Sequence, residues 1–146
     1  MTIACVCALT AAVGAAAATT ARYRGRFQPS GSLRFALDHR GGHRWVTGFA
    51  FSQFPLANCD HGANTETSSL SYDVRVKDRS FHTVGIVGHR KRPRSELILR
   101  GTLGRHGHAS GTMRVFGSAV PVDDTSKSAH DRCDSGVVDW SARRQR

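Results

Sequence analysis

Residues 97–115 read LILRGTLGRHGHASGTMRV. Apolar or small side chains occupy every second position, first from Leu97 to Leu103 and then from Ala109 to Val115. A period of two is typical of a β-strand with one buried face, because successive side chains point to opposite sides of a sheet. The intervening residues 104–107, GRHG, are turn formers. The stretch therefore predicts two antiparallel strands joined as a hairpin.

The same alternation recurs through most of the chain. It is most regular where Leu70, Tyr72, Val74 and Val76 alternate with polar residues, and this run predicts one continuous strand. Phe54 and Phe116 fall outside the alternation and are candidates for exposed aromatic residues. The other alternating or apolar runs lie at 33–37, 45–51, 81–87 and 136–142.

Composition supports an all-β class. The chain has 146 residues, which suffices for one domain, and it contains 15 glycines and only two glutamates, Glu66 and Glu96. Glycine weakens helix interiors and glutamate favours them, so this composition argues against a helical bundle. Turn signals every 8–12 residues predict a single antiparallel β-sandwich, or a partly closed barrel. The polar and acidic segment from Pro121 to Asp134 is expected to form one long loop.

The first 21 residues resemble an export signal more than a structural element. They carry no charge and contain an apolar run over residues 3–9, followed by alanines. Small residues at 16–18 and 19–21 fit signal-peptidase cleavage after Ala18 or Ala21. We therefore expect a signal peptide at 1–21 and a secreted β domain at 22–146. A buried Ala-rich helix and an uncleaved anchor are the alternatives.

Export would leave two cysteines in the mature chain, Cys59 and Cys133. In an oxidising compartment two remaining cysteines most simply pair with each other. A bond between them would close a loop of about 75 residues and stabilise the fold by about 4 kcal/mol in the chain-entropy description. Two separate buried thiols are the alternative.

Several short motifs give the chain a family resemblance. They are Asn58-Cys59-Asp60, residues 100–103 (RGTL), residues 109–113 (ASGTM) and residues 133–142 (CDSGVVDWSA). Together they resemble small secreted all-β proteins of high-GC bacteria, and the resemblance covers most of residues 22–146. It implies a signal peptide, one β domain and a C-terminal strand containing Trp140. The shared motifs are turns, core residues and cysteines, so the resemblance transfers no catalytic residue.

Basic residues suggest what the domain binds. The formal net charge is +10, and Arg90, Lys91, Arg92 and Arg94 fall at the tip of an expected hairpin. Such a patch can bind an anionic cell-surface or extracellular polymer or glycan. Nucleic acid is not the expected partner, because an exported protein rarely meets it and no aromatic residues interleave the basic run. If the terminal strands pair, arginines would form a second positive face from residues 22, 24, 26, 143, 144 and 146.

The alternative is a structural or inert secreted protein whose charge serves solubility, since 18 of the 21 basic residues are arginine, as a high-GC codon bias would produce. Catalytic signatures such as GxSxG, GxGxxG and the P-loop are missing, so no catalytic residue is assigned. A hydrolase with an unrecognised site is the third interpretation. The chain has eight histidines, but neither an HExxH nor a CxxC motif supports a metal site. No metal or cofactor is expected.

Overall fold

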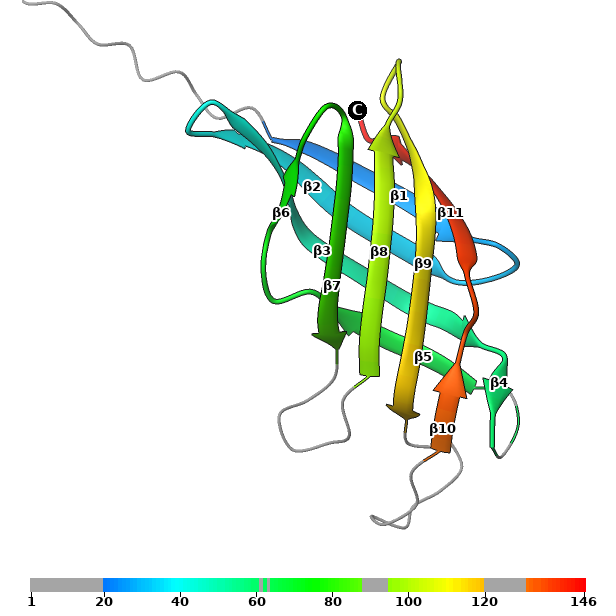
Figure 1. Ribbon diagram of the computed structural model, residues 1–146. Helices are drawn as coiled ribbons and strands as arrows, with labels where there is room; N and C mark the ends of the chain where they lie inside the picture. Colours follow the sequence, from blue (N-terminus) through cyan, green and yellow to red (C-terminus); the bar gives the residue numbers. More distant parts are fainter. Residues whose placement is uncertain (1–19, 61, 63, 88–94, 120–130) are drawn as a thin grey trace, which may run out of the picture.

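The computed structural model describes residues 20–60, 62, 64–87, 95–119 and 131–146. Within these ranges the chain forms strands and no helix, which confirms the all-β prediction (Figure 1). The strands are β1 (Ala21–Phe27), β2 (Ser32–Arg40), β3 (His43–Leu56), β4 (Asn58–Cys59), β5 (Asn64–Ser69), β6 (Val74–Val76), β7 (Ser80–Val87), β8 (Ser95–Leu103), β9 (His108–Ala119), β10 (Asp131–Asp134) and β11 (Val138–Arg144).

All the strands belong to one antiparallel sheet that folds over its own core. Its main path runs β4-β10-β9-β11-β1-β2-β3-β5, with β8 and β7 continuing from β9, and β6 pairing with β3. In Figure 1, β7, β8 and β9 form one layer, and β1, β2 and β3 cross behind them in the other. Among the described residues, β6 and β7 are joined by the isolated bridge between Lys77 and Ser80 and not by a strand ladder, and the sheet is not closed into a barrel. The arrangement is the predicted sandwich-like fold.

The hairpin predicted at 97–115 is present. β8 and β9 pair in register from Leu97 opposite Val115 to Leu103 opposite Ala109. These inward side chains are buried. The turn between the strands places His106 and Gly107 at positive φ, a conformation that glycine adopts without strain.

Aromatic rings from both layers form the core. Trp140 on β11 lies 6.2 Å from Phe35 on β2 and 6.1 Å from Phe81 on β7, measured between ring centroids. Tyr23 on β1 stacks on Phe35 at 4.7 Å. These residues alternate with exposed ones along their strands. The core therefore fixes which face of β1 and β2 points to solvent.

The prediction that Phe54 is exposed was wrong. Its side chain is 0% exposed and packs edge-on against Phe27, with ring centroids 4.8 Å apart. Gln53 has a φ of 53°, and the register of β3 against β5 shifts between Phe51 and Phe54. This bulge inserts an extra residue and returns Phe54 to the inner face. Phe116 is half-buried, and the Arg114 guanidinium lies over its ring.

The pattern at 70–76 predicted one continuous strand, and this prediction was wrong. β5 ends at Ser69, the chain bends over residues 71–73, and β6 begins at Val74. β5 and β6 both run beside β3, on either side of Gly48, which has a φ of 57°. Tyr72 leaves the sheet between them, is 39% exposed, and reaches Thr83 with a 3.0 Å hydrogen bond between the hydroxyls.

The predicted disulfide is present, and the end of the long loop predicted before it forms a strand instead. Cys59 and Cys133 are bonded and lie directly opposite each other on β4 and β10. β10 occupies residues 131–134, within the segment expected to be loop, because its backbone pairs with β4 and β9. The acidic composition of this segment concealed the short strand. Residues 121–130 of the expected loop lie outside the described residues.

Candidate functional site

The predicted basic hairpin falls where the structure is not described. Arg90, Lys91, Arg92 and Arg94 lie within residues 88–94, outside the described ranges. The strands on either side of this segment do pair, with Val87 opposite Ser95. The segment therefore connects two antiparallel neighbours, as the sequence predicted.

The terminal strands pair, which was the condition for the second basic surface. β1 runs antiparallel to β11, with Arg24 directly opposite Arg143. Gly25 makes this approach possible, because a Cβ at that position would collide with the Ser141 carbonyl oxygen. β1 also pairs with β2, so the first strand lies between β11 and β2.

Three arginines line up across these three strands. Arg24 is directly opposite Arg143 on one side and Arg34 on the other. Directly opposite residues in antiparallel sheets have Cβ atoms about 4.5–5.5 Å apart, and like charges at that spacing destabilise the sheet. All three side chains are exposed on the outer face. The row concentrates positive charge at the expense of folding stability.

Further arginines extend the surface along β1. Arg22 and Arg26 alternate with buried Tyr23 and Phe27, so they point outward with Arg24. Residues two apart on a strand are separated by about 7 Å. We call this surface the arginine face, and it consists of Arg22, Arg24, Arg26, Arg34 and Arg143. Arg144 and Arg146 are also exposed, but Arg144 is opposite the inward-facing Tyr23, so it does not share the outward face of Arg143, contrary to the prediction from the sequence.

Ion pairs distinguish the arginine face from other arginines of the described chain. In the part of the chain that the structure describes, none of its five residues forms an ion pair. Arginines elsewhere do pair: Arg40 contacts Asp73, and Arg114 contacts Asp134. The Arg114 guanidinium, with a backbone hydrogen bond from Gly136, lowers the pKa of the Asp134 carboxyl below its ordinary value.

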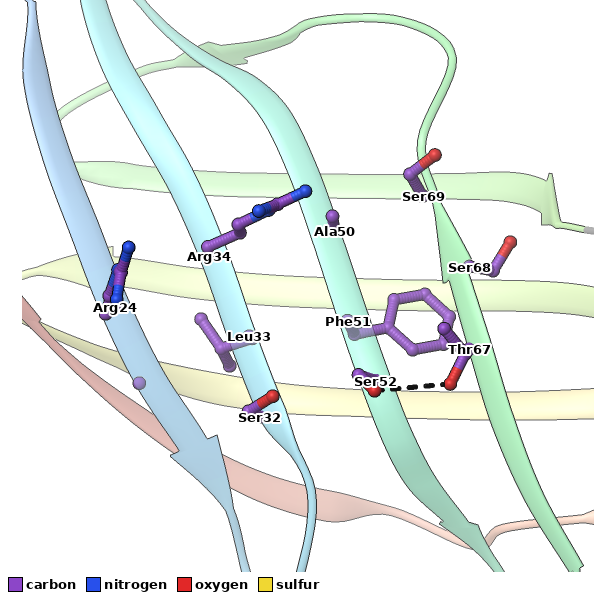
Figure 2. A pocket seen from close by; sticks show the side chains of 11 residues that line it. Arg24, Ser32, Leu33, Arg34, Ala50, Phe51, Ser52, Thr67, Ser68 and Ser69 are labelled. Carbon is purple, nitrogen blue, oxygen red and sulfur yellow. Dashed lines mark hydrogen bonds between the residues drawn. The ribbon is translucent and has the colours of Figure 1, made fainter.

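A hollow opens beside the arginine face. It has a volume of about 600 Å³, and Arg24 and Arg34 line it from β1 and β2. Figure 2 shows these two arginines on neighbouring strands, with hydroxyl side chains across from them. A second hollow of about 390 Å³ shares Gly25 and Ser32 with the first and includes Arg26. The hydroxyl residues of the first hollow are Ser32, Ser52, Thr67, Ser68 and Ser69.

Two of these hydroxyls are ordered by the bulge in β3. The backbone N–H of Gln53 donates to Thr67 Oγ1 at 3.1 Å. The Thr67 hydroxyl in turn donates to Ser52 Oγ at 3.4 Å, the dashed line in Figure 2. Because the Thr67 hydroxyl is the donor in this bond, the Ser52 O–H can still donate to a ligand. The bulge that buries Phe54 thus also arranges polar groups on the outer face.

One acid lies near this region, on the inner face of β5. Glu66 is directly opposite Phe54 and is partly buried. Burial raises the pKa of its carboxyl, because the charged form loses hydration. Glu66 does not line the hollow.

The described histidines lie on the surface and in turns. His43 contacts the Arg75 guanidinium at 3.1 Å on the surface, and His106 lies in the β8–β9 turn. Among the described residues, no three histidine, cysteine, aspartate or glutamate side chains lie close enough to hold a metal ion.

Sequence reasoning anticipated part of this surface and missed part. Arg34 falls between Leu33 and Phe35 in the alternating run at 33–37, a pattern that indicates an outward side chain, but it was not assigned to a site. The turn signal at 28–31 predicts that the flanking strands form a hairpin, and that pairing puts Arg34 beside Arg24. The hydroxyl residues on β3 and β5 gave no such signal, because their approach depends on the bulge at Gln53.

The comparisons with known proteins return no relative. The chain matches no protein-family model, no curated protein and no solved structure. Within the described residues, no helix is long and apolar enough to cross a membrane.

Proposed function

We propose that the protein is exported and that its arginine face binds an anionic polymer without catalysing a reaction. The observation that carries this proposal is the row Arg143, Arg24 and Arg34, three like charges directly opposite one another with no ion-pair partner among the described residues. A bound polyanion would convert this repulsion into attraction. Destabilising arrangements of this kind are a common feature of functional sites.

The chemistry of arginine supports an anionic ligand. A guanidinium is always charged and presents a planar set of donors that matches carboxylate, sulfate or phosphate groups. The arginine face spaces such groups about 5 Å apart across the strands and about 7 Å apart along β1. This two-dimensional array favours a ligand with several anionic groups over a single ion.

The disulfide and the N-terminus support export. Disulfides form and persist in oxidising compartments, and Cys59–Cys133 closes a sequence separation of 74 residues. β1 begins at Ala21, one residue before the predicted start of the secreted domain. Cleavage after Ala18 would leave β1 whole, whereas cleavage after Ala21 would remove its first residue.

Binding to a panel of ligands tests the proposal. The panel comprises a heparin-derived oligosaccharide, inorganic polyphosphate, single-stranded DNA and neutral dextran, each titrated against the purified protein by fluorescence anisotropy. The variant Arg24→Gln/Arg34→Gln/Arg143→Gln removes the row. The control Arg75→Gln/Arg100→Gln/Arg132→Gln removes three exposed arginines from other strands, so both variants lose the same net charge.

We expect saturable binding to at least one anionic polymer and none to dextran. The row variant should lose at least about tenfold in affinity, since each charge-assisted hydrogen bond contributes about 1.5–3 kcal/mol. The control should retain most of the affinity. Equal losses in both variants would mean that only net charge matters, and would favour the inert, soluble protein.

A further inference from the structure

We infer that the ligand of the arginine face is an acidic polysaccharide, and that the larger hollow holds one of its sugar units. This inference rests on the proposed function and specifies its ligand class. In this arrangement the anionic group of the sugar contacts Arg24 and Arg34. The sugar hydroxyls then face the hydroxyl side chains on β3 and β5 (Figure 2).

The hollow has two chemically different sides, and each side corresponds to one part of an acidic sugar. On one side Arg24 and Arg34 donate hydrogen bonds to a carboxylate or sulfate. On the other, the hydroxyl residues both donate and accept, as sugar hydroxyls do. The hydrogen bonds from Gln53 N–H to Thr67 and from Thr67 to Ser52 orient two of these groups in advance. Preorganised polar groups lower the entropic cost of binding.

The size and the polar lining of the hollow suit a sugar. Its volume of about 600 Å³ lies within the usual range of small-molecule sites, roughly 300–1,000 Å³. Leu33 and Phe51 also line it, but each is only 3% exposed and belongs to the core, so the accessible side chains are mainly hydroxyls and arginines. Sugar hydroxyls can both donate to and accept from such hydroxyls, whereas the oxygens of a polyphosphate only accept.

The continuation of the hollow favours a polymer. The second hollow shares Gly25 and Ser32 with the first and adds Arg26. A chain leaving the first hollow can therefore pass along β1 to another guanidinium. Nucleic acid fits less well, because single strands are bound by stacking on exposed aromatic rings. The one ring lining the larger hollow, Phe51, is buried.

Removing the hydroxyls tests the inference separately from the charge. The variant Ser52→Ala/Thr67→Val deletes the ordered hydroxyl pair. Its matched control is Ser80→Ala/Thr102→Val, which deletes another cross-strand hydroxyl pair, 3.5 Å apart on β7 and β8. Affinities are measured for a heparin-derived oligosaccharide, for inorganic polyphosphate and for single-stranded DNA, and thermal melting confirms that each variant folds.

We expect Ser52→Ala/Thr67→Val to weaken oligosaccharide binding about tenfold, the effect of losing two hydrogen bonds, and to change polyphosphate binding less than about twofold. The control should change neither. The inference is overturned if the hydroxyl variant binds the oligosaccharide like wild type, or loses both ligands equally. Tighter binding of DNA than of the oligosaccharide would also overturn it.

The outcome for the arginines distinguishes this inference from the proposed function. Arg24→Gln/Arg34→Gln should weaken both the oligosaccharide and polyphosphate. If that variant weakens both ligands and the hydroxyl variant weakens neither, the polyanion site stands and the sugar assignment fails. If the arginine variant weakens neither ligand, the polyanion site itself fails.

Discussion

Arg24 is the residue at which binding and stability most directly oppose each other. Its neighbours across both strand pairs are arginines, and no described acid pairs with it. Arg26, two residues further along β1, is opposite Ser141 and Ser32 instead. Both arginines are exposed on the same face of the same strand, so comparing them isolates the effect of the charged neighbours.

We predict that Arg24→Gln raises the free energy of unfolding by about 0.2–1 kcal/mol, because it removes two like-charge contacts. Urea unfolding at low ionic strength measures this, and the gain should shrink as added salt screens the repulsion. Arg26→Gln is the control and should change stability less. A loss of stability in Arg24→Gln, independent of salt, would contradict the prediction.

Glu66 gives a second prediction at the level of one side chain. Burial raises its pKa in the folded protein. Between the ordinary and the raised pKa the folded state binds more protons than the unfolded state, so stability falls as pH rises through that window. Glu66→Gln removes this effect. We therefore expect the variant to melt at a higher temperature than wild type at pH 7.

The pH dependence provides the control for Glu66→Gln. Below the ordinary glutamate pKa both states of the wild type are protonated, so the difference in melting temperature should close there. An advantage of the variant that persists unchanged at low pH would show that burial of the charge is not its cause.

At the scale of elements, the disulfide joins the short strands β4 and β10. β4 has two residues and β10 has four, so their backbone pairing alone is limited. Cys59 and Cys133 join them across 74 residues of sequence. Without this link, the segment before β11 would be held to β4 by few contacts.

We predict that Cys59→Ser/Cys133→Ser lowers the free energy of unfolding by about 4 kcal/mol, the loop-closure contribution expected for this separation. Urea unfolding of the purified variant measures the loss. Wild type treated with a reductant should show a similar loss, and the variant should not respond to the reductant. A loss below about 1 kcal/mol would show that the link adds little to β4–β10 pairing.

The elements that sequence predicted best are those whose side-chain period is unbroken. The β8–β9 hairpin follows directly from alternation and a glycine turn. The pattern failed where the backbone departs from the regular pleat. The bulge at Gln53 shifted Phe54 to the inside, and the bend after Leu70 left only Val74–Val76 of the 70–76 run as strand. A bulge changes which residues share a face, and no composition signal marks its position.

At the scale of the molecule, sheet order creates the candidate site. The two ends of the described domain become neighbours only because β11 pairs with β1. The sequence predicted a positive face from the terminal strands on that condition, without Arg34. It did not predict the register that puts Arg143, Arg24 and Arg34 in one row. Register depends on pairing between residues far apart in the sequence, and local patterns carry no information about it.

The salt dependence of binding reports how many arginines contact the polymer. Each guanidinium that contacts an anionic polymer releases a condensed counterion, so the logarithm of affinity falls linearly with the logarithm of salt concentration. We would measure that slope for a heparin-derived oligosaccharide with wild type and with Arg24→Gln/Arg34→Gln/Arg143→Gln. We expect the slope to be shallower by about three in the variant, roughly one for each arginine removed. An unchanged slope would show that the polymer contacts other residues, and would contradict the assignment of the arginine face.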